Sequence, residues 1–176
     1  MCQAASREQT FTACVLPEVE VLLRAAAALT ARPADAEDLV RDTLLRAYRA
    51  MDRFDGEQPR VWLLALMRRA EFDWRHRRTA PDTGPDPTAA AWTAASPKYV
   101  VNSHGFDEAV GTVLTSLPDR YRLVVRLVDM GGLSYAEAAG LLGVSERTVT
   151  HRVHRARRRM RTRLAAAGAA PQKNTR

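Results

Sequence analysis

The sequence predicts an all-α fold in which two small helical domains are joined by a flexible linker rich in proline and alanine. Apolar residues recur at helical spacing through most of the chain, and no stretch alternates convincingly at the period of two that marks a strand. Helical spacing stops between residues 79 and 105, where four prolines and two glycines accompany an almost complete loss of charge. We therefore expect a tail at 1–14, a first domain at 15–78, a linker at 79–106, a second domain at 107–165 and a disordered tail at 166–176.

The first domain is predicted to contain three or four helices. The first has an apolar stripe over 15–29, and it should end before Pro33, because the residue that precedes a proline disfavours the helical conformation. The second covers 35–51, again with one apolar face. An Asp-Gly pair at 55–56 marks a turn, and Pro59 suits the first turn of a third helix.

The second domain begins with two predicted helices, at about 106–117 and 121–128, which Pro118 separates. A helix-turn-helix follows them. Ser134 is predicted to cap its first helix, and Glu137 stands three residues later at the capping-box position.

The second helix of this motif is the most informative part of the chain. Gly143 permits a tight turn before it, and Ser145 is a suitable N-cap. One face of the helix is apolar, with residues at steps of four, three, four and four: Val149, Val153, Ala156, Met160 and Leu164. The other faces are rich in arginine. Such a helix suits the major groove of DNA, because guanidinium groups pair with guanine edges and with phosphates.

Two other interpretations of these arginines were weighed. Cations near a helix C-terminus oppose the helix dipole, which would explain residues 157–163 but not Arg147, Thr150 and Arg152 near the N-terminal end. A basic helix can also lie on a membrane surface, but the apolar stripe lacks the Trp, Phe and Leu content of interfacial helices. The pattern therefore favours DNA.

The distribution of charge supports a nucleic-acid partner. The formal net charge is +7, to which residues 1–78 contribute +1, residues 79–106 contribute −1 and residues 107–176 contribute +7. The whole excess thus lies in the segment that contains the helix-turn-helix, where phosphates would have to be neutralised.

Composition excludes several other classes of protein. Cys2 and Cys14 are the only cysteines, which argues against a disulfide scaffold and for a reducing compartment. The cysteines and histidines show no metal-ligand spacing, so we expect no metal and no cofactor. No run approaches the roughly 20 apolar residues of a membrane span, and we expect a cytoplasmic protein without a membrane segment. Because no Ser-His-Asp arrangement or phosphate loop is visible, we expect no enzyme activity.

The predicted helix at 35–51 is acidic towards its start and basic towards its end. The acidic residues are Asp35, Glu37, Asp38 and Asp42, and the basic ones are Arg41, Arg46 and Arg49. This order complements the helix dipole, as an ordinary solvated face would. An exposed face of this kind can also bind a partner helix, and both interpretations stay open on chemistry alone.

Together these segments resemble a known family. Residues 35–48 (DAEDLVRDTLLRAY), continued by 52–57 and 59–64, resemble conserved region two of bacterial RNA polymerase sigma factors of the sigma-70 family, nearest to the extracytoplasmic-function (ECF) group. Region four of the same family is resembled by residues 117–122, 132–139 and 143–145, together with Thr148, Val149, Arg152 and 155–157. The matches cover most of the chain outside the termini and the linker.

The resemblance implies a transcription initiation factor without catalytic activity, which directs RNA polymerase core to promoters through their −10 and −35 elements. Its partners would be the polymerase core, at the β′ coiled coil and the β flap, promoter DNA and an anti-sigma factor.

The resemblance also implies which residues bind each partner. The polymerase core would be bound by Asp38, Leu39, Asp42 and Arg46. The melted −10 strand would be bound by Phe54, Asp55, Gly56, Glu57, Arg60, Arg68, Arg69, Trp74, Arg75, Arg77 and Arg78. The −35 duplex would be bound by Ser145, Arg147, Thr148, Thr150, His151, Arg152, Arg155, Arg157 and Arg158.

Two non-enzymatic alternatives remain at this point. One is a stand-alone helix-turn-helix regulator whose N-terminal domain senses a ligand or dimerises, which would bind a palindromic duplex without polymerase. The other is an adaptor that binds a protein partner only, and loss of all DNA affinity on Arg152→Ala with Arg155→Ala would argue against it.

Overall fold

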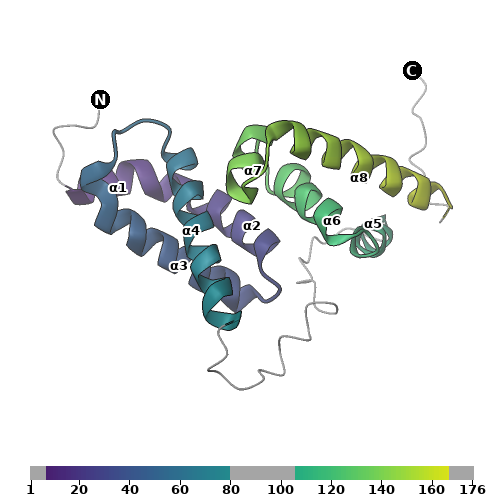
Figure 1. The fold of residues 1–176 in the computed structure, drawn as a ribbon, viewed down its shortest axis with the longest axis horizontal. Helices are drawn as coiled ribbons and strands as arrows, with labels where there is room; N and C mark the ends of the chain where they lie inside the picture. Colours follow the sequence, from purple (N-terminus) through teal and green to yellow (C-terminus); the bar gives the residue numbers. More distant parts are fainter. Residues whose placement is uncertain (1–6, 80–105, 167–176) are drawn as a thin grey trace.

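The computed structural model describes residues 7–79 and 106–166, and every regular element within these ranges is helical (Figure 1). The prediction of an all-α fold is confirmed. The expected conformation of the linker, the beginning of the expected N-terminal tail and most of the expected C-terminal tail lie outside the described residues.

The first domain follows the predicted order of helices with one addition at its start. Its elements are α1 (Arg7–Val15), η1 (Leu16–Glu18), α2 (Val19–Leu29), α3 (Pro33–Ala50), η2 (Met51–Arg53) and α4 (Pro59–Thr79). The backbone of Arg32 is extended, with φ −111° and ψ 141°, as the residue before a proline should be. Pro33 then begins α3, and Pro59 begins α4.

The expectation of a tail at 1–14 is wrong for residues 7–14, which form helix α1. This helix buries Val15 alone, so it has no apolar stripe that the sequence could reveal. Other contacts hold it against the end of α3. The ring of Phe11 lies edge-on to that of Tyr48, with centroids 5.4 Å apart, and Arg7 forms an ion pair with Asp52.

The helix expected over residues 15–29 is interrupted at its start. Pro17 lies in the short 3-10 turn η1, and α2 begins only at Val19. A proline inside a continuous helix would lack an amide donor and would clash with the carbonyl of the preceding turn, which explains the break.

The core of the first domain lies between α2, α3 and α4. Leu22, Leu39, Leu63 and Met67 have no exposed surface there. Thr43 is also fully buried, and its hydroxyl donates to the carbonyl of Leu39 over 2.7 Å. The polar atom is thus satisfied within its own helix, so its burial carries little penalty.

The second domain contains α5 (Phe106–Thr115), α6 (Asp119–Val125), the π-helical turn η4 (Arg126–Met130), α7 (Tyr135–Leu142) and α8 (Glu146–Ala166). The sequence analysis did not anticipate the π turn. Its wider winding is shown by the amide of Gly131, which donates to the carbonyl of Arg126 over 2.8 Å. Leu117, Tyr121, Val125 and Ala156 form a second buried cluster, which joins α6 to α8.

The helix-turn-helix is confirmed in detail. The amide of Glu137 donates to Ser134 Oγ over 3.2 Å, and the amide of Ser134 donates to Glu137 Oε2 over 2.7 Å, which completes the capping box. Gly143 has a φ of +66°, a left-handed conformation that glycine adopts without a Cβ penalty. The amide of Thr148 donates to Ser145 Oγ over 3.2 Å, as expected of an N-cap.

The two domains contact each other directly. Helix α4 packs against α7, and α2 packs against η4 (Figure 1). The larger apolar cluster therefore contains buried residues of both domains, among them Leu22 and Leu63 of the first and Leu127, Leu133 and Ala138 of the second.

Candidate functional site

The second helix of the helix-turn-helix, α8, separates its apolar face cleanly from its charged faces. Val149, Val153 and Ala156 are fully buried, while Arg147 and His151 are exposed, one turn apart. Arg155 and Arg158 continue the exposed side along the next two turns, at helical spacing. The arrangement offers a line of cationic and hydrogen-bonding groups along a rigid helix, as a major-groove reader requires.

Some residues predicted to contact the −35 duplex also have partners within the protein. Ser145 caps α8 and is hydrogen-bonded through Oγ to Thr148 Oγ1 at 2.8 Å, and Thr148 is only half-exposed. The hydroxyl of Thr150 donates to the carbonyl of Glu146 over 3.0 Å. Arg152 is half-buried. The exposed arginines and His151 are thus better placed for DNA than these four residues.

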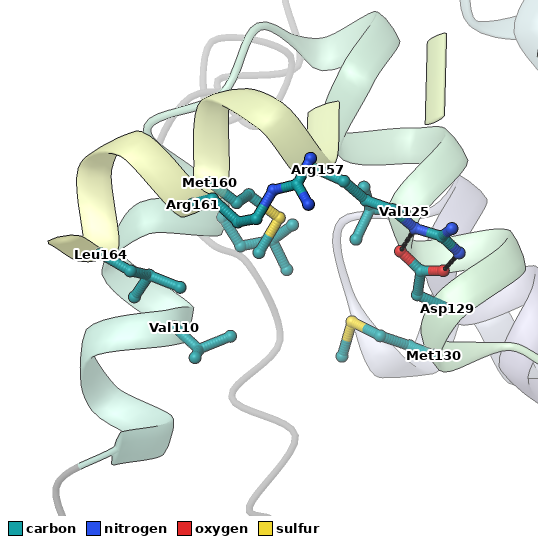
Figure 2. Close-up of a pocket in the computed structure, with 9 residues that line it drawn as sticks. Val110, Val125, Asp129, Met130, Arg157, Met160, Arg161 and Leu164 are labelled. Atoms are coloured by element: carbon teal, nitrogen blue, oxygen red, sulfur yellow. Dashed lines mark hydrogen bonds and ion pairs between the residues drawn. The ribbon is translucent and has the colours of Figure 1, made fainter. Parts of the chain in front are cut away.

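Arg157, predicted to bind phosphate, is paired with an acidic residue of its own domain. Its guanidinium donates to both carboxylate oxygens of Asp129, which the π turn η4 presents to α8 (Figure 2). This hydrogen-bonded carboxylate raises the pKa of the Arg157 guanidinium. The bidentate pair links η4 to α8, so the side chain has a structural role.

An apolar pocket lies beside this ion pair, between α5, η4 and α8 (Figure 2). Its lining is apolar apart from Asp129, Arg157 and Arg161, and the side chain of Met130 projects from η4 with half of its surface exposed. The other lining residues are Val110, Leu114, Val125, Met160 and Leu164.

A second group of cations surrounds Tyr121 at the junction of α6 and α8. The guanidinium of Arg159 lies 4.8 Å from the centroid of the tyrosine ring, and that of Arg120 lies 5.0 Å from it. Hydrogen bonds from Arg155 and Arg120 lower the pKa of the Tyr121 hydroxyl. The buried ring therefore helps to hold the arginines of this part of α8 in place.

The loop between α3 and α4, predicted to bind the −10 strand, is ordered by local contacts. The rings of Phe54 and Trp62 are stacked with centroids 4.6 Å apart, so both face the core side of the loop. The amide of Glu57 donates to Asp55 Oδ1 over 2.9 Å, an Asx turn. Gly56 has a φ of +84° in open space, so backbone conformation rather than crowding favours glycine there.

The arginines predicted to bind the −10 strand along α4 differ in their surroundings. Arg60 Nε donates to Glu18 Oε2 over 2.6 Å, and this hydrogen bond raises the pKa of the guanidinium. Arg75 is paired with Glu71. Arg69 and Arg77 are exposed, and the side chain of Arg78 lies outside the described residues.

The exposed aromatic side chain of α4 is Phe72 and not Trp74. Trp74, predicted to contact the −10 strand, is half-buried against the apolar core, whereas Phe72 is 58% exposed. The ring of Phe72 lies 3.9 Å from that of His76, one turn further on. Helical periodicity could have identified this residue, because position 72 falls outside the buried stripe of Leu63, Met67 and Ala70.

The predicted polymerase-binding residues of α3 divide into a surface set and one core residue. Asp38 is exposed and accepts from Arg41 Nη1 over 2.9 Å. Arg46 lies between Asp42, at 3.2 Å, and Asp73 of α4, at 2.8 Å. The hydrogen bond from Asp42 is the main cause that raises the pKa of Arg46.

The assignment of Leu39 to the polymerase-binding surface is wrong, because this side chain is fully buried. Leu39 belongs to the inward stripe of α3 with Ala36, Val40, Thr43 and Ala47. It can support the position of Asp38 and Asp42, but it cannot touch a partner while the domain is folded.

Two further searches concern metals and membranes. Across residues 7–79 and 106–166, no cluster of three or more histidine, cysteine, aspartate or glutamate side chains is suited to hold a metal ion. None of the helices in the described part of the chain is long and apolar enough to cross a bilayer.

Comparison with known protein families accounts for both domains. The sigma-70 region 2 family matches residues 17–80, and the sigma-70 region 4 family matches residues 107–160. The chain is 32% identical over 157 residues to the ECF RNA polymerase sigma factor EcfG of Rhodopseudomonas palustris (strain TIE-1), which covers 88% of this chain and 85% of that protein.

Other relatives extend this result. The ECF RNA polymerase sigma factor SigC of Mycobacterium tuberculosis is 35% identical over 130 residues, and the chain spans 66% of its length. The matched part spans 56% of the sigma factor SigE of Mycolicibacterium smegmatis. Among solved structures, the sigma factor RpoE of Bartonella quintana, bound to the anti-sigma factor NepR, has 27% identity and a TM-score of 0.56, with 85% of this chain and 94% of that chain covered. The chain belongs to the extracytoplasmic-function sigma factors of the sigma-70 family.

Proposed function

We propose that this protein directs RNA polymerase core to specific promoters and has no catalytic activity of its own. The observation that carries the proposal is the combination, in one chain, of a sigma region 2 domain with a charged α3 surface and a sigma region 4 domain with an arginine-lined helix-turn-helix. A cytoplasmic location follows from this function, since the polymerase and the promoter lie there.

For the −35 element, the proposed reading surface is the exposed side of α8. Arg147 and His151 lie in the first two turns, where a recognition helix contacts base edges, and Arg155 and Arg158 follow them. We assign base contacts to the first pair and phosphate contacts to the second, because base edges specify and phosphates position.

For the −10 element, the proposed surface joins the 54–58 loop to the outer side of α4. Single-stranded DNA is bound by cations beside exposed aromatic rings, which here are Arg69, Arg77 and Phe72. A flipped base needs a shaped polar pocket, and the ordered loop with Asp55 and Gly56 is suited to provide one.

For the polymerase, the proposed contacts are Asp38, Asp42 and Arg46 towards the β′ coiled coil. The apolar pocket between α5, η4 and α8, with the half-exposed Met130 at its edge, is the surface we propose for the β flap. An anti-sigma partner is also proposed, because the related Bartonella quintana sigma factor is bound to one.

Run-off transcription with purified core polymerase over a randomised promoter library tests this function. We expect a defined set of start sites that share two separated sequence elements. The alternative of a stand-alone regulator predicts the opposite, namely no start-site selection with core enzyme and tight occupancy of a palindromic duplex by the protein alone.

A further inference from the structure

The contact between the two domains involves residues that the proposed function assigns to DNA. Arg68 of α4 lies against Gly143 in the turn of the helix-turn-helix, so closely that a Cβ at position 143 would clash with its guanidinium. Arg60 of α4, besides its bond to Glu18, has Nη1 3.8 Å from Glu137 Oε1 on α7. Two cations predicted to face the −10 strand therefore face region 4 instead.

A second set of links lies outside the predicted DNA surfaces. Arg24 Nε of α2 donates to the carbonyl of Gly131 over 3.3 Å. Arg126 of η4 donates to the carbonyl of Ala27, and burial lowers the pKa of its guanidinium. Both carbonyls belong to the opposite domain, so each arginine holds the domains together by a charge-assisted bond.

The apolar part of the contact continues the core. The larger buried cluster includes α2 and α4 residues such as Leu22 and Met67, together with Leu127, Leu133 and Leu141 of the second domain. Interfaces between domains of one chain usually resemble transient protein–protein interfaces, so the domains can separate when a partner favours the open form.

We propose that this interdomain contact is autoinhibitory: the free protein is closed, with Arg60 and Arg68 withdrawn from DNA and the helix-turn-helix turn held against α4, until polymerase binding separates the domains. The inference rests on the proposed function, because it assumes that these surfaces bind promoter DNA. A closed form lowers the apparent affinity for DNA by the fraction of molecules that are open.

The test uses the full chain with Arg24→Gln and Arg126→Gln together, which removes the two links that are not assigned to DNA. The matched control is Arg49→Gln with Arg122→Gln, which also removes one positive charge from each domain. Arg122 donates to the carbonyl of Thr115 over 2.9 Å, a bond within its own domain. Glu137→Gln is the second variant, because glutamine still serves the capping box but loses the charge that faces Arg60.

Small-angle scattering of the free protein and anisotropy of labelled promoter oligonucleotides are the two readouts. We expect the Arg24/Arg126 variant to have a larger radius of gyration and to bind DNA about tenfold more tightly, if about one molecule in ten of the unaltered protein is open. The control should bind no more tightly than the unaltered protein. If circular dichroism shows that the double variant is unfolded, Glu137→Gln decides the question, with the same direction expected.

An unchanged radius, or a larger radius without tighter DNA binding, would overturn the inference. Run-off transcription by the unaltered protein separates the two proposals. If it selects start sites while the variants bind DNA as it does, only the autoinhibitory contact fails. If it selects none, the proposed function fails whatever the scattering shows.

Discussion

Helices α4 and α8 have the same length, 21 residues, and both are rich in arginine, yet they display their charges differently. Helix α8 has a fully buried stripe on one side and exposed Arg147, Arg155 and Arg158 on another. On α4, Arg60 and Arg75 are in ion pairs, and the exposed ring of Phe72 interrupts the basic surface. The difference suits two substrates, because a duplex presents ordered base edges and phosphates, while a single strand needs rings for stacking.

The largest effect should come from the residue that α3 contributes to the core beneath this surface. Leu39→Ala should lower the free energy of unfolding by about 2–5 kcal/mol, since it removes a fully buried side chain. Asp38→Lys with Asp42→Lys should leave stability nearly unchanged and abolish co-elution with core polymerase. Urea denaturation and gel filtration measure the two effects. A stable Leu39→Ala protein that fails to bind polymerase would restore Leu39 to the binding surface.

The next effect sharpens the assignment of α8 to the duplex. Arg147→Ala should weaken binding to the preferred −35 sequence by about 1–3 kcal/mol and relax the preference at one position, if the guanidinium pairs with a base edge. Arg158→Ala should weaken binding to all sequences alike. Competition binding with a set of single-base variants distinguishes the two. Equal losses on every sequence after Arg147→Ala would contradict base reading.

A comparable but smaller effect is expected on α4. Phe72→Ala should weaken binding of a −10 single strand by about 1–2 kcal/mol, because each stacked base contributes in this range. The fold should not change, since 58% of the side chain is exposed. Leu45→Ala is the matched control, because this α3 side chain is 49% exposed. Anisotropy with a labelled oligonucleotide measures the affinity, and equal losses for both variants would remove Phe72 from the site.

The smallest effect concerns the frame of the helix-turn-helix. Ser134→Ala should lower the free energy of unfolding by about 1 kcal/mol, because it leaves the amide of Glu137 without its capping acceptor. Affinity for the −35 duplex should fall only through this loss of stability. Thermal unfolding beside duplex titration checks the expectation. A large loss of affinity at full stability would indicate that Ser134 itself contacts DNA.

How far the sequence predicts the structure depends on whether a feature is periodic or local. The helix-turn-helix, its caps and Gly143 were predictable, because each follows from a local rule that needs no tertiary context. Helix α1 was not, since it buries only Val15 and is held by the distant residues Tyr48 and Asp52. The π turn η4 likewise has no signal in residue spacing.

The site was predictable to the level of helix faces and not to single side chains. Leu39 was placed on a surface because the family motif contains it, although its spacing from Ala36 and Thr43 indicates the core. The pairing of Arg157 with Asp129, and of Arg46 with Asp73, joins residues 28 and 27 positions apart. Such pairs depend on how helices pack, which periodicity within one helix cannot show.

The division of labour between α8 and α4 is tested most directly by single-round transcription that crosses two variants with two altered promoters. Arg147→Ala and Phe72→Ala proteins would each be assayed with core polymerase on the selected promoter, on one with a scrambled −35 element and on one with a scrambled −10 element. The account predicts that the Arg147→Ala defect disappears only on the scrambled −35 template, and the Phe72→Ala defect only on the scrambled −10 template. Defects of equal size on all three templates would contradict it.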